Sequence, residues 1–245
     1  MKLCIIGHTR SRSSHLRDVL GVYNNIPIIG QKLDTLYDML TKGTWVSNGI
    51  PEKEPSFYLN LLKLHLAEVK HSPTGVVKIH PTQLSFIPTN GKLIDFDMFS
   101  FSQYKKVYFT ARKDIPELVC SLYVAHVLGK FTYKDKADIV KNIEPMKFEG
   151  NIGYNRMLML LYSDLVSLHL KEYLTSHGIE WEHLDYEDIP EFIEQKLDNL
   201  GSTNVETNYR YKDIVTNYDE LESIYESFKP IAHRRFYDAN PQLDI

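Results

Sequence analysis

Cysteine and long apolar runs are scarce in this chain. Two cysteines among 245 residues are too few for a disulfide framework, and neither lies in a metal-ligand spacing. No segment approaches the roughly 20 apolar residues that a membrane-spanning helix needs, and the apolar run at residues 3–6 is too short for a secretory signal peptide. The sequence therefore predicts a soluble protein, expected in the cytoplasm, with Cys4 and Cys120 as buried, reduced thiols.

A large excess of charge of either sign is also missing. The chain has 28 Lys and Arg against 32 Asp and Glu, for a formal net charge of −4, which argues against a surface built to hold nucleic acid. A content of 43% hydrophobic and 24% charged residues is typical of a globular protein and excludes disordered, collagen-like and coiled-coil chains. Because no linker, repeat or low-complexity tract divides the sequence, we expect a single domain over residues 1–245.

Short apolar runs alternate with amphipathic stretches along the chain. This pattern predicts strands at 3–6, 27–30, 76–79, 106–111 and 180–184, and helices at 15–20, 34–40, 57–70, 115–128, 152–177 and 190–200. Residues 42–56 have no period and are predicted to form a long loop. In the longest helix we expect the core-facing residues to be Met157, Leu158, Leu161, Leu165, Leu168 and Leu170. The alternation predicts an α/β fold of three layers, with a mainly parallel central sheet flanked by helices.

A turn rich in serine and arginine connects the first predicted strand to the first predicted helix. Residues 7–16 read Gly-His-Thr-Arg-Ser-Arg-Ser-Ser-His-Leu. A strand–loop–helix junction directs several backbone N–H groups and the positive end of a helix dipole at one point. Here the hydroxyls of Ser11, Ser13 and Ser14 and the charges of Arg10 and Arg12 would complete a phosphate or sulfate cradle, to which His8 is a weaker candidate contributor. In the alternative interpretation, Ser13 or Ser14 is only a helix N-cap and the arginines are a solvated face.

The turn lacks the two common nucleotide-binding fingerprints. A Walker A loop needs a lysine directly before the Ser or Thr that holds magnesium, and this turn has none. The dinucleotide fingerprint needs three spaced glycines, whereas Gly7 stands alone.

A second basic group follows the strand predicted at 106–111. Arg112 and Lys113 come at its carboxyl end, where open α/β sheets bind their ligands. Ser121 lies about two turns into the next helix, so its hydroxyl can point back toward a phosphate. The spacing does not decide between Arg112 and Lys113, and the alternative is a surface Arg-Lys pair with an ordinary helix serine.

Together these segments resemble the sulfotransferases that use 3′-phosphoadenosine 5′-phosphosulfate (PAPS), in the variant found in bacterial enzymes for carbohydrates and glycolipids. The loop of that variant reads Gly-x-x-Arg-Ser-Gly-Ser-Thr-x-Leu, and the matching residues are Gly7, Arg10, Ser11, Ser13, Ser14 and Leu16. Arg12 stands in place of the second glycine, and Ser14 in place of the threonine. Residues 112–123 are similar to the segment that binds the 3′-phosphate in the family, and residues 183–189 are similar to its Tyr-Glu-Asp-Leu stretch.

The resemblance implies a P-loop-like fold and transfer of a sulfuryl group from PAPS to a hydroxyl or amine of a glycan or small metabolite. It implies no metal ion, and adenosine 3′,5′-bisphosphate as the product. Arg10 and the N–H groups of residues 11–14 would stabilise the leaving phosphate, and Arg112 or Lys113, with Ser121, would bind the 3′-phosphate. Arg234 and Arg235 would fold over the nucleotide, unless they form a solvated basic turn.

The acceptor also needs a general base. The resemblance points to Asp34, four residues after Gly30, although Asp34 is equally suited to cap the following helix. His80, after the strand at 76–79, is the rival base. Lys78 in that strand is a further donor-site candidate, but alternation alone does not decide which face it occupies.

The acceptor pocket and the reaction class leave alternatives open. Residues 42–56, with Trp45, and the aromatic stretch 96–104 are candidates for the pocket, although aromatic residues also serve as ordinary core. The first rival function is a P-loop kinase for a nucleoside or small metabolite, which would prefer ATP with magnesium. The second is a non-catalytic nucleotide-binding module, in which the arginines act only as an anion clamp.

Overall fold

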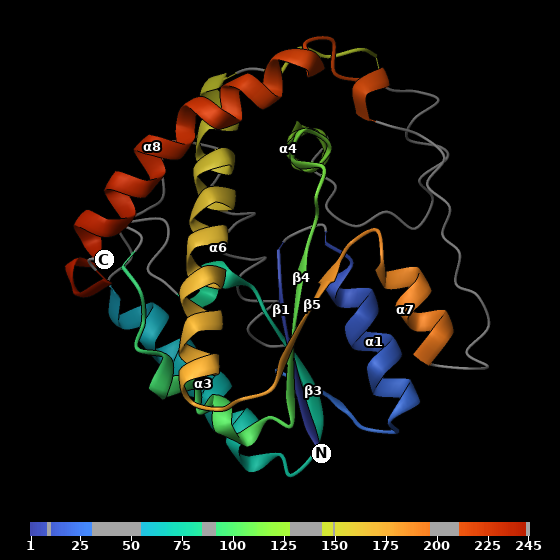
Figure 1. Ribbon diagram of the computed structural model, residues 1–245, viewed down its shortest axis with the longest axis vertical. Coiled ribbons are helices and arrows are strands. Elements are labelled where there is room, and N and C mark those ends of the chain that lie inside the picture. Colours follow the sequence, from blue (N-terminus) through green and yellow to red (C-terminus); the bar gives the residue numbers. More distant parts are fainter. Residues whose placement is uncertain are drawn as a thin grey trace.

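A five-stranded sheet forms the centre of the computed structural model (Figure 1), which describes residues 1–8, 11–30, 55–84, 92–127, 144–148, 150–196 and 211–243. The strands are β1 (Lys2–Gly7), β2 (Ile28–Ile29), β3 (Gly75–Ile79), β4 (Lys106–Ala111) and β5 (Trp181–Asp185), in the order β2-β3-β1-β4-β5. All neighbouring pairs are parallel. The five strands therefore end at one side of the sheet, called the carboxyl edge below.

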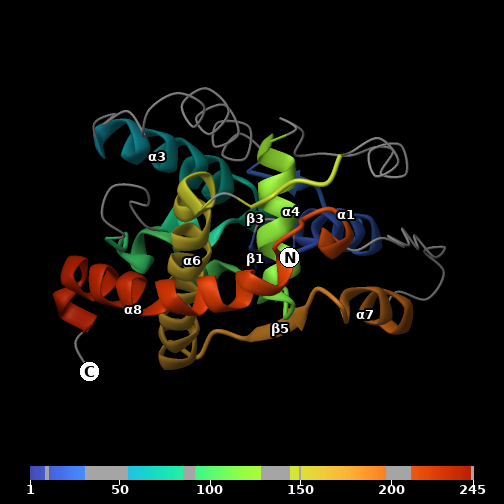
Figure 2. The same cartoon turned by 90° about the horizontal axis from the view of Figure 1, so that it is seen from above.

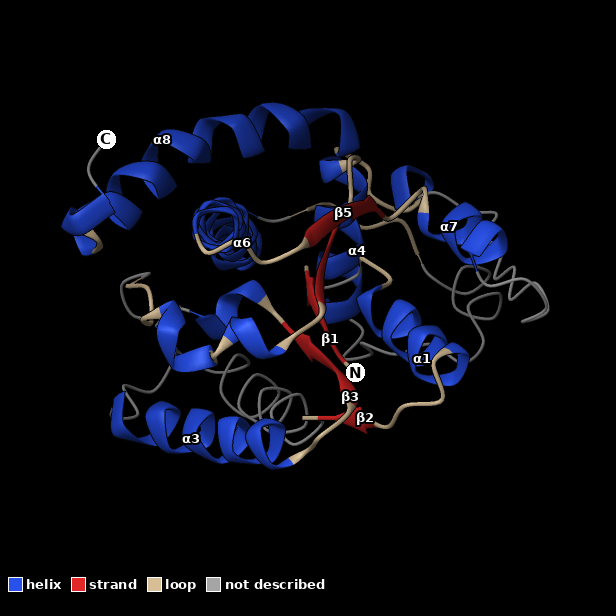
Figure 3. Cartoon of the chain, turned by 60° about the horizontal axis from the view of Figure 1, so that its bottom comes forward, coloured by secondary structure: helices blue, strands red, loops and turns tan. Residues whose placement is uncertain are grey.

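Helices cover both faces of this sheet (Figure 3). One face carries α1 (Ser13–Tyr23) and α7 (Ile189–Lys196), and the other carries α3 (Pro55–His71), α6 (Gly150–Ser176) and α8 (Leu221–Ala239). Figure 2 shows α4 (Ile115–Val127) between α6 and α1 when the molecule is seen from above. The predicted three-layer α/β fold with a parallel sheet is confirmed.

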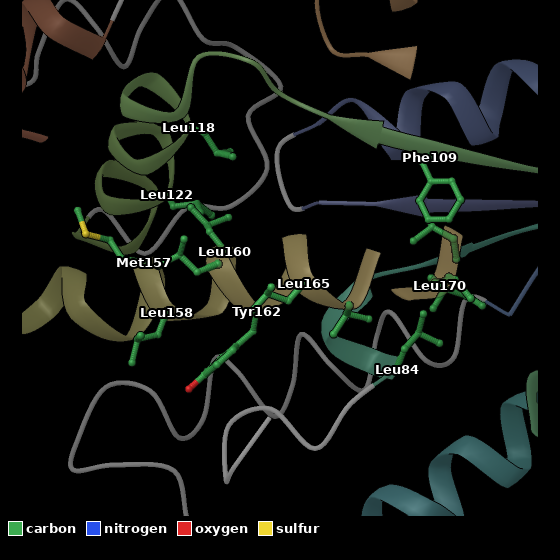
Figure 4. Close-up of a cluster of buried hydrophobic side chains, with 14 of the residues drawn as sticks. Leu84, Phe109, Leu118, Leu122, Met157, Leu158, Leu160, Tyr162, Leu165 and Leu170 are labelled. Atoms are coloured by element: carbon green, nitrogen blue, oxygen red, sulfur yellow. The ribbon is translucent and has the colours of Figure 1, made fainter. Parts of the chain in front are cut away.

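Successive side chains of β1 point to opposite faces of the sheet and contribute to two hydrophobic cores. Leu3 and Ile5 belong to the cluster that includes α1 and α7, whereas Cys4 and Ile6 belong to the larger cluster around α6. A parallel strand covered on both faces is apolar on both, which explains the continuous apolar run at the start of the chain. Figure 4 shows the larger cluster, in which α6 side chains lie beneath Leu118 and Leu122 of α4.

Most predicted elements occur within a few residues of their expected bounds, but one expected core residue is wrong. Leu168 is 48% exposed. It lies in the second half of α6 on the same stripe as Asp164, Glu172 and Thr175, which are also exposed. The first half of α6 is covered on more sides than the second, so an apolar residue on this stripe is buried early in the helix and exposed later.

Other sequence predictions have mixed outcomes. Both cysteines are free and buried, as predicted, and burial raises their thiol pKa values. Of the helices in the described ranges, none is long and apolar enough to cross a membrane. The helix predicted at 34–40 and the loop predicted at 42–56, up to residue 54, lie outside the described residues.

Candidate functional site

The first strand ends at Gly7, where the chain folds back tightly against the carboxyl edge. A Cβ atom at Gly7 would lie 2.2 Å from the Cβ atom of Ser13 and 2.6 Å from the Oγ1 atom of Thr110. Real Cβ atoms do not approach other atoms this closely. Only glycine therefore allows the first residue of α1 to sit directly on the ends of β1 and β4.

Ser11 fixes this loop from within. Its buried hydroxyl donates to the carbonyl oxygen of His8 at 2.6 Å and lies 2.7 Å from the Oγ1 atom of Thr110. The backbone N–H group of Ser11 also donates to the His8 carbonyl, at 3.3 Å. The loop itself thus uses both donors of Ser11 in this structure, whereas the sequence predicted that this hydroxyl contacts a phosphate.

The helix that follows presents an N-terminus at the carboxyl edge. It begins at Ser13, so Arg12 is the preceding residue and neither Ser13 nor Ser14 is an N-cap. The first bond of the helix runs from the N–H group of Leu16 to the carbonyl oxygen of Arg12, at 2.9 Å, so the N–H groups of residues 13–15 precede the helical ladder. Within the described first turn of α1, the Arg12 side chain makes no capping bond and no acidic residue occurs. This end of the helix therefore attracts anions.

Arg12 adopts a backbone conformation that favours glycine. Its φ is 57° and its ψ is 13°, in the left-handed region that side chains with a Cβ atom occupy at a cost. Its guanidinium carbon lies 4.1 Å from the centre of the Tyr186 ring. Arg12 thus holds a conformation that glycine adopts without strain, and its side chain adds a cation at the loop.

We expect Arg12→Gly to raise the free energy of unfolding by about 0.5–1 kcal/mol, because glycine removes the left-handed strain at this position. Urea denaturation at pH 7 measures the change. Arg17→Gly is the matched control, because Arg17 lies inside α1 and a glycine there should cost about 1 kcal/mol. A loss of stability in Arg12→Gly would show that the contact with Tyr186 outweighs the strain.

Lys78 brings a buried ammonium group to the same place. It lies on β3 and is only 8% exposed. Its Nζ atom donates to the Oγ atom of Ser14 at 2.9 Å, so this side chain points toward α1. The structure thus decides on which face of the sheet Lys78 lies, a question that the sequence left open. Its ammonium group adds positive charge beside the N-terminus of α1.

His80, which follows β3, contacts the end of β1. Its Nδ1 atom lies 2.8 Å from the carbonyl oxygen of Gly7, and because a carbonyl only accepts, Nδ1 carries the proton. Burial and, after it, the charge of Lys78 lower the pKa of His80 to about 3, although the bond to Gly7 acts in the opposite direction. A neutral imidazole of such low pKa takes up a proton poorly near neutral pH. The geometry therefore favours His80 as an anchor for Gly7 over its predicted role as a base.

His8 is directed away from the loop. It is buried, and its Nε2 atom lies 3.3 Å from the Oδ1 atom of Asp164 on α6. Burial lowers the pKa of His8, and Asp164 acts against this shift. This placement does not support the predicted contact with sulfate, because the ring points into the α6 side of the sheet.

At the end of β4 the two neighbouring cations have different partners. The Nζ atom of Lys113 lies 2.8 Å from Asp185 and 3.5 Å from Asp188. Arg112 instead places its guanidinium carbon 4.5 Å from the centre of the Tyr186 ring, and its buried Nε atom has no hydrogen-bond partner among the described residues. The geometry therefore favours Arg112 for anion binding.

Ser121 is covered by a segment that the sequence did not connect with it. The hydroxyl of Ser121, on α4, is buried and donates to the Tyr211 hydroxyl at 3.3 Å. The backbone N–H group of Tyr211 in turn donates to both carboxylate oxygens of Glu117, at 2.9 and 3.1 Å. Contact between Ser121 and a phosphate thus requires that the segment at Tyr211 move aside.

Four other predicted positions remain to be placed, and two of them fall outside the part of the chain that the structure describes. Arg10 and Asp34 lie outside the described residues, so their roles stay predictions. Arg234 and Arg235 are exposed on the second half of α8, and α6 lies between this part of α8 and the sheet (Figures 1 and 3). The structure therefore does not bring these two arginines to the loop and favours the solvated interpretation.

The aromatic stretch 96–104 is part of the core, which corrects its expected place in an acceptor pocket. Four of its aromatic side chains are buried in the larger cluster, namely Phe96, Phe99, Phe101 and Tyr104. The stretch also leads into the first residue of β4, so it lies at the edge of the sheet opposite the loop.

Three residues of the site were missed in the sequence: Thr110, Tyr186 and Tyr211. Their contacts join segments far apart in the chain, and local patterns carry no signal for them. Comparison of the chain with models of known protein families and with curated proteins finds no match. The functional argument therefore rests on the chemistry of the site.

Proposed function

We propose that this protein transfers a sulfuryl group from PAPS to a hydroxyl or amine of a carbohydrate or small metabolite. The observation that carries the proposal is the junction of β1 and α1. There, a helix N-terminus without a capping side chain from Arg12 lies at the carboxyl edge beside the buried ammonium of Lys78. This combination suits the anionic end of the donor, and the sequence resemblance suggests which donor it is.

The donor groups at this edge of the sheet suit a ligand with two separate phosphates. The N–H groups of residues 13–15 and the Lys78 ammonium would hold the 5′-phosphosulfate. Arg112, at the end of the adjacent strand β4, would hold the 3′-phosphate, and its buried Nε atom supplies a donor that the described residues leave unused. The bound donor supplies the electrophilic sulfur.

In the proposed reaction the chain mainly positions the reactants and stabilises negative charge. The helix N-terminus, Lys78 and Arg10 stabilise the charge that develops on the leaving phosphate, which is the kind of contribution that preorganised donors make. Gly7 and Ser11 hold the loop in its tight turn, and His80 anchors the Gly7 carbonyl. The proton of the acceptor passes to Asp34, the base that the resemblance implies.

Calorimetric titration with adenosine 3′,5′-bisphosphate, compared with ATP and magnesium, tests the donor. We expect the bisphosphate to bind at least tenfold more tightly and without a metal ion. Lys78→Met should weaken this binding about tenfold, as expected for a lost charged hydrogen bond of about 1.5 kcal/mol. Lys70→Met is the matched control, because Lys70 is exposed near the end of α3.

The contrary results are equally specific. A preference for ATP with magnesium would replace the proposal with the kinase alternative. Tight binding of the bisphosphate without turnover of PAPS, tested over a panel of hydroxylated and amino acceptors, would favour the non-catalytic module.

A further inference from the structure

Tyr186 lies between two positively charged segments of the site. Its backbone N–H group donates to the carbonyl oxygen of Ala111 at 2.7 Å, which continues the pairing of β4 and β5 beyond the last strand residue. Its ring contacts the guanidinium groups of both Arg12 and Arg112, with carbon-to-centroid distances of 4.1 and 4.5 Å. One aromatic ring therefore joins an arginine before α1 to an arginine after β4.

Three carboxylates lie within two residues of Tyr186 in sequence; two of them contact Lys113, and the third, Glu187, is exposed. Asp185 and Asp188 contact Lys113 at 2.8 and 3.5 Å. An aromatic ring attracts a guanidinium without neutralising its charge, whereas a paired carboxylate would neutralise it. Lys113 thus keeps these two acidic side chains occupied, and the charge of Arg12 and Arg112 is retained for a ligand.

Among the described residues, Arg112 has an ion pair with one acidic side chain, Glu117, which also binds a backbone N–H group. The Oε1 atom of Glu117 lies 3.9 Å from the Nη2 atom of Arg112, which is long for a hydrogen bond. Both oxygens of Glu117 accept from the N–H group of Tyr211. The ring contact and this long ion pair therefore act together on the orientation of the Arg112 guanidinium.

We propose that Tyr186 is a positioning residue that holds Arg12 and Arg112 together as one anion clamp, and that this clamp selects ligands with two anionic groups over ligands with one. Two cations held near the same ring repel each other, and a ligand that contacts both relieves this repulsion. Holding both side chains in place beforehand also reduces the entropy lost on binding. The inference rests on the proposed function for the identity of the nucleotide, but the clamp itself is testable with inorganic anions.

The test is calorimetry with adenosine 3′,5′-bisphosphate, adenosine 5′-monophosphate and inorganic pyrophosphate on four proteins: wild type, Tyr186→Leu, Tyr186→Phe and Tyr23→Leu. We expect Tyr186→Leu to weaken binding of the bisphosphate and of pyrophosphate about tenfold, which is the effect expected from the loss of two cation–π contacts. Binding of the monophosphate should weaken about threefold or less. Tyr186→Phe keeps the ring and should bind like wild type. Tyr23→Leu is the matched control, because Tyr23 is 51% exposed at the far end of α1.

A second variant keeps the test valid if Tyr186→Leu does not fold. Arg12→Gly removes one guanidinium and leaves the ring in place, so it should lose most of the discrimination between the bisphosphate and the monophosphate. Discrimination that survives in Arg12→Gly, or pyrophosphate affinity that is unchanged in a folded Tyr186→Leu, would overturn the clamp.

The wild-type titrations separate this inference from the proposed function. Binding of pyrophosphate but not of the bisphosphate would contradict the sulfotransferase proposal while the variants still test the clamp. If wild type binds neither anion, the clamp is overturned as well.

Discussion

Gly7→Ala is expected to abolish detectable binding of adenosine 3′,5′-bisphosphate and to lower the free energy of unfolding by about 3 kcal/mol. The new methyl group would lie 2.2 Å from the Cβ atom of Ser13 and 2.6 Å from the Oγ1 atom of Thr110. Neither neighbour has room to retreat, because Ser13 opens α1 and Thr110 lies within β4, and overpacking of this kind typically costs 1–3 kcal/mol or more. Relief of the clash would push α1 away from the carboxyl edge and so separate its N-terminus from Lys78. Urea denaturation and calorimetry measure the two effects.

Gly178→Ala is the matched control for this substitution. Gly178 has a φ of +66°, and no atom lies within 4 Å of the position that its Cβ atom would take. Alanine there should cost about 1 kcal/mol through backbone strain alone and leave ligand binding unchanged. A Gly7→Ala protein that binds the bisphosphate as tightly as wild type would show that the tight turn is not the donor site.

Asp34→Asn is expected to lower kcat for sulfuryl transfer at least 100-fold with little change in bisphosphate affinity, because loss of a general base typically costs a factor of 10²–10⁴. His80→Asn should retain most of the activity. The side-chain amide of asparagine can donate to the Gly7 carbonyl as the Nδ1 atom of His80 does at 2.8 Å, so the anchor is preserved. Rates with radiolabelled PAPS, beside calorimetric affinities, compare the two variants.

A third variant separates anchoring from proton transfer. His80→Leu removes the bond to Gly7, so we expect it to weaken bisphosphate binding as well as transfer. Loss of transfer in His80→Asn with affinity intact would identify His80 as the base after all. Full activity in Asp34→Asn would remove Asp34 from the reaction.

Much of the fold was predictable because its determinants are local. Period-two and helical apolar patterns depend on neighbours along the chain, and β4 has the bounds that its pattern predicts, 106–111. The continuous apolar run of β1 fits its place between two hydrophobic clusters, one on each face of the sheet. The predicted burial of Leu168 is wrong because this residue lies on the same helical stripe as residues that are buried earlier in α6. Only the arrangement of the other elements leaves its end of α6 uncovered.

The candidate site divides in a similar way. The loop sequence indicated an anion-binding junction at the end of β1, since Gly7, the serines and the arginines are contiguous. Residue types alone, however, do not distinguish a hydroxyl that binds a ligand from one that fixes a loop. Ser11 is of the second kind because Thr110, 99 residues away, lies beside it.

By itself, the sequence determined the α/β class, the order of most strands and helices along the chain, and the position of a basic turn after the first strand. These follow from periodicity and from the geometry of a strand–loop–helix junction. The tertiary structure alone decided that Lys78 points to α1, that Lys113 pairs closely with Asp185 and Asp188 while Arg112 has only a long contact with Glu117, and that Tyr186 joins Arg12 to Arg112. These choices depend on which distant strands become neighbours in the sheet, because side chains at the carboxyl edge are brought together by strand order and not by proximity in sequence.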